Sequence, residues 1–273
     1  MKKIYKTAKR FLIERIPAKD AKEILDSYLE LPDQSREPVD IPDLFRHLLE
    51  SAQNANMKAG VIGESIGGFI KLGKALYSFD PRKTLKKFEG SPDALLDHIV
   101  KTLKPRGKIR NMPRSIWPKY CKTILSAAAF INQFASGEEF YEWANSLYGN
   151  PRSMPALPLI LAAEIEGIGY SLACDFLKEL GFIEYGKPDV HVTDIFVGIG
   201  LCPPKASPYQ VQKVISQIAE AAGVSSYNVD KLFWLIGSGK FYMHNHMGKD
   251  GRIGRMKEEF IEQCVTMTST RTS

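Results

Sequence analysis

Apolar residues recur every three or four positions along nearly every readable segment of this chain, and that spacing is typical of amphipathic α-helices. Between residues 18 and 31, for example, one helical face would carry Ala21, Ile24, Leu25, Tyr28 and Leu29. No segment clearly shows the alternation of apolar and polar residues that indicates a half-buried strand. We therefore predict an all-α fold.

Several of the predicted helices begin with a recognisable capping sequence. Ser91 is followed by a proline and an acidic residue, which suit the first turn of a helix and the positive end of its dipole. Ser136 and Glu139 have the spacing of a capping box, and Ser207 precedes a proline as Ser91 does. These signals divide the helical pattern into separate helices joined by short turns.

The composition fits a folded globular protein and excludes several other classes. With 273 residues, 44% of them hydrophobic and 25% charged, the chain can bury a core without disulfides or a structural metal. Its apolar runs stay far below the ~20 residues needed to span a bilayer, so we expect no membrane segment. Four scattered cysteines without a CxxC pair predict reduced thiols in a cytoplasmic protein.

The net charge of +6 is unevenly divided along the chain, because residues 1–136 sum to +10 and residues 137–273 to −4. A dense basic stretch lies within residues 101–122, with Trp117 and Tyr120 interleaved and no acidic residue. Such a cluster favours a surface that follows nucleic-acid phosphates, and the alternative is a solvated basic loop. For Trp117 we expect a place in the core, and the alternative is an aromatic side chain that stacks on nucleic acid. The predicted basic surface comprises Lys104, Arg106, Lys108, Arg110 and Arg114.

The most informative segment runs from residue 165 to residue 196. Two glycines, Gly167 and Gly169, stand two positions apart between two helical patterns, where they allow a tight turn and a close approach by another molecule. The helix that begins near Tyr170 has unpaired amide groups at its start, which can bind a phosphate oxygen. A turn at residues 186–188 then precedes Asp189 and His191.

This segment resembles the helix-hairpin-helix GPD superfamily of DNA glycosylases, the endonuclease III-like enzymes of base-excision repair. The resemblance rests on the Gly-x-Gly hairpin, on Ala173 behind it, and on an aspartate at the superfamily's spacing. Asp189 follows Ser171 by 18 residues, and His191 stands two residues later, as in many members. The clear match covers about 32 residues.

The resemblance implies an enzyme that hydrolyses the bond between base and sugar of a base flipped out of DNA. Asp189 would be the catalytic carboxylate, because a negative charge stabilises the positive charge that builds on the sugar. The groups that contact DNA phosphates would be Gly167, Ile168, Gly169, Ser171, Lys187 and His191. Hairpin carbonyls in this superfamily often also bind a monovalent cation, which the resemblance implies here.

The sequence departs from the superfamily's pattern at three points. Ser171 occupies the position of the lysine with which some members form a Schiff base and cut the strand, so we expect a monofunctional glycosylase without AP-lyase activity. Lys187 is the alternative residue whose amine could form such a Schiff base. Glu166 replaces the usual hairpin proline. Only Cys202 and Cys264 follow Asp189, so we expect no iron–sulfur cluster, no other metal and no required cofactor.

Mapped onto the superfamily, the chain would form two helical lobes with the hairpin and Asp189 at the cleft between them. One lobe would comprise residues 90–183, and the other residues 1–89 with 184–273. We expect a monomer that binds double-stranded DNA, associated with the nucleoid in a prokaryote. The main alternative is a non-catalytic helix-hairpin-helix protein that only binds DNA. A third is a helical interaction protein in which the hairpin is coincidental.

Overall fold

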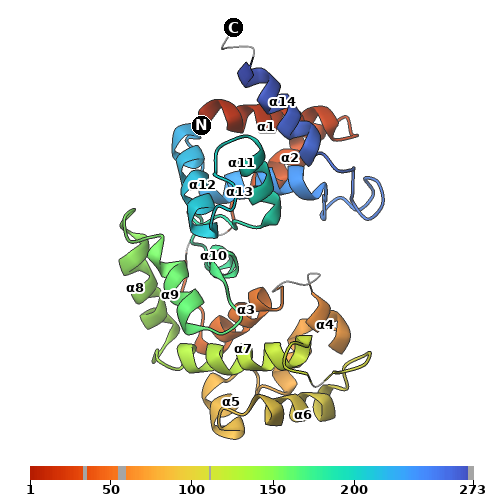
Figure 1. The fold of residues 1–273 in the computed structure, drawn as a ribbon. Coiled ribbons are helices and arrows are strands. Elements are labelled where there is room, and N and C mark those ends of the chain that lie inside the picture. The colour runs from red at the N-terminus through yellow and green to blue at the C-terminus, as the bar shows by residue number, and fades with distance from the viewer. Residues whose placement is uncertain (33–35, 55–59, 111, 270–273) are drawn as a thin grey trace. The chain divides into compact units, whose positions relative to one another are not determined.

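The computed structural model consists of helices joined by loops (Figure 1), and it describes residues 1–32, 36–54, 60–110 and 112–269. Besides helices, these ranges contain two isolated β-bridges at Arg252, so the all-α prediction is confirmed. No helix in the described ranges combines the length and the hydropathy needed to cross a membrane. Backbone contacts divide the chain into a terminal unit, Met1–Gln34 with Leu180–Ser273, and a middle unit, Ser35–Glu179.

The terminal unit is organised around helix α13 (Ser226–Ser238), which packs against the other described helices of this unit. These are α1 (Lys2–Arg15), α2 (Ala21–Leu29), α11 (Val190–Gly198), α12 (Pro208–Ala222) and α14 (Lys257–Ser269). In its core, the ring of Phe233 makes edge-to-face contacts with Phe196 at 5.0 Å and with Phe260 at 6.0 Å. This apolar stack joins α11, α13 and α14.

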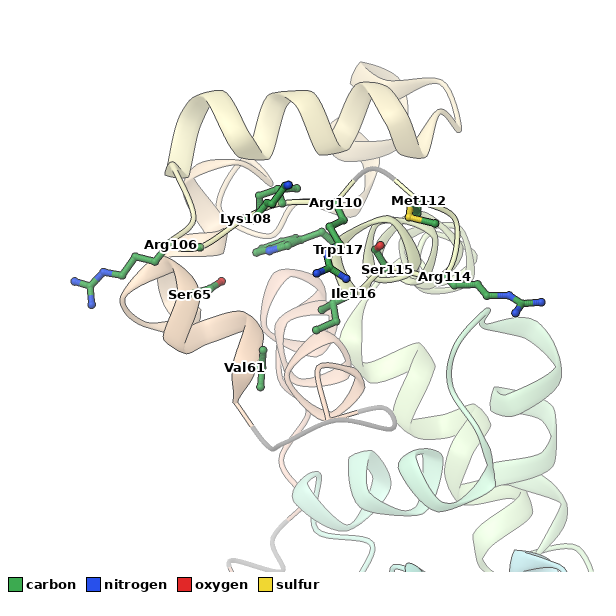
Figure 2. A pocket seen from close by; sticks show the side chains of 12 residues that line it. Val61, Ser65, Arg106, Lys108, Arg110, Met112, Arg114, Ser115, Ile116 and Trp117 are labelled. Carbon is green, nitrogen blue, oxygen red and sulfur yellow. The ribbon is translucent and has the colours of Figure 1, made fainter.

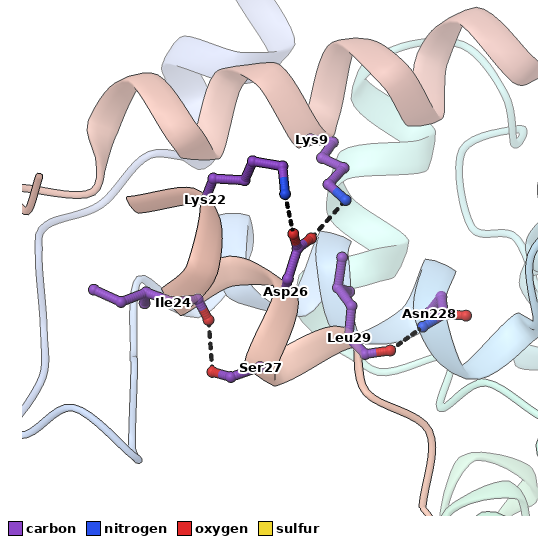
Figure 3. Close-up of polar contacts among 7 residues, drawn as sticks. All are labelled: Lys9, Lys22, Ile24, Asp26, Ser27, Leu29 and Asn228. Atoms are coloured by element: carbon purple, nitrogen blue, oxygen red, sulfur yellow. Dashed lines mark hydrogen bonds and ion pairs between the residues drawn. The ribbon is translucent and has the colours of Figure 1, made fainter. Parts of the chain in front are cut away.

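Polar contacts tie the first two helices to each other and to the C-terminal part of the chain (Figure 3). Asp26 on α2 pairs with Lys9 of α1 at 2.7 Å and with Lys22 at 2.8 Å. The side-chain amide of Asn228 on α13 donates a hydrogen bond to the backbone oxygen of Leu29 at 2.6 Å. One unit is therefore assembled from segments nearly 200 residues apart in sequence.

The middle unit is centred on α7 (Ile116–Ile131), the apolar helix that contains the aromatic residues of the basic stretch. Trp117 and Tyr120 are both buried, and the Tyr120 hydroxyl donates a hydrogen bond to the backbone oxygen of Leu49 at 2.7 Å. The other helical elements of this unit are α3 (Ile41–Ala52), α4 (Val61–Ile66), the 3₁₀ helix η1 (Phe69–Lys74), α5 (Pro81–Phe88), α6 (Pro92–Leu103), α8 (Gly137–Tyr148), α9 (Ala156–Glu164) and α10 (Tyr170–Glu179).

The capping residues act as their sequence predicts, with one variation. The hydroxyl of Ser91 accepts a hydrogen bond from the third residue of its helix, and Ser207 forms a complete capping box with Gln210. Ser136 accepts a hydrogen bond from the Glu139 amide, but the Glu139 carboxylate accepts one from Ala135 instead of the Ser136 amide. The sequence therefore located these helix starts correctly and misplaced one partner by a single residue.

The boundary of the middle unit differs from the predicted one, which began at residue 90 and ended at residue 183. Residues 35–89 group with the middle unit because α3 packs on α7 and α10, and α5 packs on α7. At the other end, the carbonyl oxygen of Ile183 accepts a hydrogen bond from Tyr227 of α13 at 2.9 Å. That contact places residues 180–183 with the terminal unit.

Candidate active site

The predicted hairpin lies in the middle unit between α9 and α10, and backbone contacts close it. The Ile168 amide donates a hydrogen bond to the carbonyl of Ile165 at 3.2 Å, and Gly167 has a left-handed φ of 86°. The Glu166 amide donates to the hydroxyl of Ser126 on α7 at 3.0 Å. Ile168 is only 3% exposed, so this residue anchors the turn in the core of the middle unit.

The two hairpin glycines have different surroundings. A Cβ on Gly167 would overlap the hydroxyl oxygen of Thr123 on α7, so this glycine is required by packing as well as by its φ. A Cβ on Gly169 would meet no atom within 4 Å. The fold therefore leaves open space beside Gly169, where another molecule can approach the backbone.

Glu166, the residue that stands in place of the superfamily's proline, is partly neutralised. Its carboxylate lies 3.5 Å from the ammonium group of Lys122 on α7. Both side chains remain substantially exposed, so the pair is weak and water competes for it. The negative charge that the sequence places beside the hairpin is thus offset by a cation of the same unit.

Ser171 is the second residue of α10 and is half-buried. Its hydroxyl has no amine chemistry, so this position cannot form a Schiff base.

Asp189 lies in the terminal unit, where it is the N-cap residue of α11. Its carboxylate accepts hydrogen bonds from the backbone amides of His191 at 2.9 Å and Val192 at 3.1 Å. These two bonds fix the orientation of the carboxylate at the positive end of the helix dipole. Asp189 therefore has a structural reason to be an aspartate as well as the predicted catalytic one.

The surroundings of Asp189 raise the pKa of its carboxyl above the ordinary value of 3.8. Burial is the largest cause, because it disfavours the charged form, and the nearby carboxylate of Asp230 on α13 adds repulsion. The Val192 amide, His191 and Lys187 act in the opposite direction. A carboxylate whose pKa is raised in this way is better suited to accept a proton near neutral pH than a solvated aspartate.

Helix α13 supports the segment that carries Asp189, and sequence reasoning missed this helix as part of the site. A Cβ on Gly186 would stand 3.0 Å from the Cβ of Asp230, and one on Gly237 would stand 2.5 Å from that of His191. Asp230 is only 3% exposed. Asp230 and Gly237 are seven residues apart and share a helical face. An acid and a glycine on one face, among the apolar residues of this helix, were the available signal.

Lys187 and His191, predicted phosphate contacts, flank Asp189 on both sides and are half-buried. The Asp189 amide donates a hydrogen bond to the Lys187 carbonyl at 2.7 Å, which tightens the turn that leads into α11. The structure therefore brings Lys187, Asp189 and His191 together in the terminal unit. Gly167, Ile168, Gly169 and Ser171 are together in the middle unit, and their meeting with Asp189 in one cleft stays a prediction.

The predicted basic surface forms the loop between α6 and α7 in the middle unit. Its five cations are all exposed, and four of them line a cavity of about 600 Å³ (Figure 2). Lys104 is outside that lining and ends α6 with a left-handed φ of 47°. Trp117 is 6% exposed, so its predicted place in the core is confirmed, although part of it also lines this cavity.

Within the described residues there is no group of three or more His, Cys, Asp or Glu side chains placed to hold a metal ion. All four cysteines are buried.

Comparisons with known proteins agree with the superfamily resemblance, although no protein-family model matches the chain. An 8-oxoguanine DNA glycosylase/AP lyase of Korarchaeum cryptofilum is 26% identical over 86 residues, which span 29% of this chain. The match covers 41% of the length of that curated relative.

A crystal structure of the Methanocaldococcus jannaschii 8-oxoguanine glycosylase/lyase, in complex with a 15mer DNA containing 8-oxoguanine, has a similar fold. The TM-score is 0.53, with 18% identity, and the likeness covers 85% of this chain and 98% of the archaeal one. The likeness of fold therefore covers most of the chain, whereas the match in sequence covers 86 residues.

Proposed function

We propose that this protein is a DNA glycosylase of base-excision repair that uses Asp189 to hydrolyse the bond between a base and its sugar. The observation that carries the proposal is the Asp189 carboxylate, held by two backbone amides at the start of α11 and given a raised pKa by its surroundings. The names of the two relatives support the same class of reaction.

The chemistry suits a single oriented carboxylate. Loss of the base leaves positive charge on the sugar, and a carboxylate beneath the ring stabilises that charge in the transition state. The same group can orient the attacking water and accept its proton. The base first leaves the helical stack and enters a pocket, which costs a few kcal/mol for a paired base and less for a damaged one.

The hairpin has the properties of a phosphate clamp. The space beside the Cα of Gly169 is open, and the start of α10 adds the positive end of a helix dipole. Ser171, Lys187 and His191 would add side-chain contacts to the backbone of double-stranded DNA, and we propose that the protein acts as a monomer. These contacts position the strand and carry no sequence information.

We propose that the enzyme hydrolyses the base–sugar bond and does not cut the strand. Both relatives are named glycosylase/lyases, so this chain would differ from them. The reason is Ser171, which offers a hydroxyl where a Schiff base needs an amine. Lys187, two residues before Asp189, is the amine whose participation the experiment below tests.

A monovalent cation at the hairpin forms part of the proposal. The carbonyl oxygens of Ile165 and Gly169 already accept backbone hydrogen bonds, whereas none reaches those of Gly167 and Ile168 from the described residues. These two carbonyls at the tip of a tight turn are suitable oxygen ligands. A cation bound there would supply positive charge next to a DNA phosphate. The proposal includes no iron–sulfur cluster and no other required cofactor.

The test uses the purified protein and a panel of duplexes that contain one modified base each, with 8-oxoguanine first because both relatives act on it by name. Hot alkali reveals sites from which the base was lost. We expect release by the wild type and by Asp194→Asn, whose carboxylate pairs with Lys257 at 2.7 Å, but not by Asp189→Asn.

Two other outcomes would change the proposal. Strand cuts without alkali, together with a borohydride-trapped adduct that Lys187→Gln abolishes, would show a lyase and contradict the monofunctional assignment. DNA binding without release of any base in the panel would favour the alternative, a non-catalytic helix-hairpin-helix module.

A further inference from the structure

The cavity of about 600 Å³ beside the basic surface has a defined frame within the middle unit (Figure 2). The Arg106 amide donates a hydrogen bond to the carbonyl of Ser65 on α4 at 2.7 Å, which ties the loop to that helix. At the other end, the Ser115 amide donates to the carbonyl of Met112 at 2.8 Å, directly before α7 begins. The cavity therefore lies between two anchored ends of one loop.

The charge around the cavity is of one sign. Arg106, Lys108, Arg110 and Arg114 line it, no acidic residue does, and none of the four is ion-paired with a carboxylate among the described residues. Four exposed cations on one loop repel one another, so the free protein is less stable than it would be with an anion bound there. Guanidinium groups hold phosphate oxygens in pairs of parallel hydrogen bonds.

The walls between these charges are apolar. Trp117 lines the cavity with the 6% of its surface that is exposed, and it packs edge-to-face on Tyr120, with ring centroids 6.2 Å apart. Ile116 lines it with 40% of its surface exposed, and Met112 with 62%. Figure 2 shows the indole of Trp117 among the side chains of Lys108, Arg110 and Ser115. A phosphate ion alone would leave these apolar surfaces in contact with water.

We propose that this cavity binds a nucleoside monophosphate unit, with the base against Trp117 and Ile116 and the phosphate held by Lys108 and Arg110. A base offers a flat apolar face and a phosphate offers the charge, and the cavity volume is within the range of small-molecule sites. The proposal goes beyond the glycosylase reaction, because neither Asp189 nor any hairpin residue lines this cavity.

The same chemistry could come from a free mononucleotide or from an unpaired nucleotide in a DNA strand. Calorimetric titrations of the full chain distinguish them with four probes: deoxyguanosine 5′-monophosphate, deoxyguanosine, inorganic phosphate and a short single-stranded oligonucleotide. We expect the monophosphate to bind more tightly than deoxyguanosine or phosphate alone. Much tighter binding of the oligonucleotide identifies a strand as the source, and equal binding identifies the free nucleotide.

Two variants test the residues. The double variant Lys108→Gln/Arg110→Gln should bind the monophosphate about tenfold more weakly, which corresponds to the loss of two charge-assisted contacts. The control Lys87→Gln/Arg152→Gln removes the same charge from exposed positions of the same unit outside the cavity. Ile116→Ser should weaken the binding of the monophosphate and leave the binding of inorganic phosphate unchanged.

Three results would overturn the proposal. The first is inorganic phosphate binding as tightly as the monophosphate, and the second is an equal loss of affinity in the control variant. The third is an absence of monophosphate and oligonucleotide binding at millimolar concentration. Thermal melts that match the wild type show that the variants are folded.

Discussion

Gly237 of α13 lies directly against His191, because a Cβ on Gly237 would stand 2.5 Å from the Cβ of His191. His191 is the second residue of α11, and its backbone amide holds the Asp189 carboxylate. The position of the proposed catalytic group thus depends on a glycine that follows Asp189 by 48 residues in the chain.

Gly237→Ala should destabilise the protein even though alanine favours a helix interior by about 1 kcal/mol. Overpacking costs about 1–3 kcal/mol, so we expect a net loss of stability. Each kcal/mol lost lowers Tm by about 2–4 °C. Base release should also slow by more than the loss of stability explains, because α11 must shift. Gly169→Ala, where the added Cβ meets nothing, is the control in the same melting experiment. A Tm above that of the wild type would contradict the close packing.

Asp189→Asn should raise stability at pH 7. The folded protein binds the Asp189 proton more tightly than the unfolded chain, because the pKa is raised. The carboxyl therefore stabilises the folded protein fully at pH values below its ordinary pKa of 3.8. This stabilisation is lost as the pH rises through the pKa that Asp189 has in the folded protein. Asparagine still offers an oxygen to both amides. Melting curves at pH 7 and pH 4 check this, since the advantage of the variant should shrink at pH 4.

Asp230→Asn should shift the acid limb of the pH–rate profile to lower pH. Removal of the Asp230 charge takes away one cause of the raised Asp189 pKa, so Asp189 loses its proton at lower pH. Burial of Asp189 remains, which makes the shift partial. Single-turnover base release between pH 4 and pH 8 measures it, with Asp194→Asn as the matched variant. An unchanged limb in Asp230→Asn would mean that Asp230 does not act on Asp189.

Substitutions of the two hairpin glycines should have different effects, one on stability and the other on DNA binding. Gly167→Ala should cost about 1–3 kcal/mol, since the new Cβ collides with Thr123 and φ is left-handed. Gly169→Ala should leave Tm unchanged and weaken duplex binding about tenfold, because the methyl group occupies the space of a phosphate. Fluorescence anisotropy with a labelled duplex gives the affinities. Wild-type affinity in Gly169→Ala would exclude a backbone clamp at this residue.

Glu166→Gln should strengthen DNA binding several-fold at low salt. The variant removes a negative charge from the hairpin and releases Lys122, now 3.5 Å from the Glu166 carboxylate, for a phosphate. The dependence of log affinity on log salt should steepen by about one unit for the extra contact. Titrations at several salt concentrations measure that slope. A slope equal to that of the wild type would mean that Lys122 does not reach the DNA.

Much of the local structure could be predicted from the sequence, since it depends on neighbouring residues. The periodicity of residues 18–31 predicts the helix that the structure has at Ala21–Leu29, and Ser91 and Ser207 predict where two helices begin. Asp189 was located by its spacing from the hairpin, and the structure adds its role as an N-cap.

What the sequence could not predict depends on contacts between distant helices. The apolar stripe of α3 indicates that this helix packs on another element, but not that its partners are α7 and α10. The predicted boundary at residue 90 and the unit boundary at residue 35 differ for that reason. The role of α13 behind Asp189 and the cavity beneath the basic loop also require the folded arrangement. Lys108 and Arg110 become a candidate site only when Arg106 is tied to α4.

The origin of the terminal unit in both ends of the chain has a consequence for synthesis on the ribosome. Residues 35–179 are contiguous, so the middle unit can fold as soon as α10 has emerged. Helices α1 and α2 are made first but must wait for α13, because Asn228 binds the carbonyl of Leu29 and the core around Phe233 comes later. During that interval the exposed apolar faces of α1 and α2 are a place where a chaperone could bind.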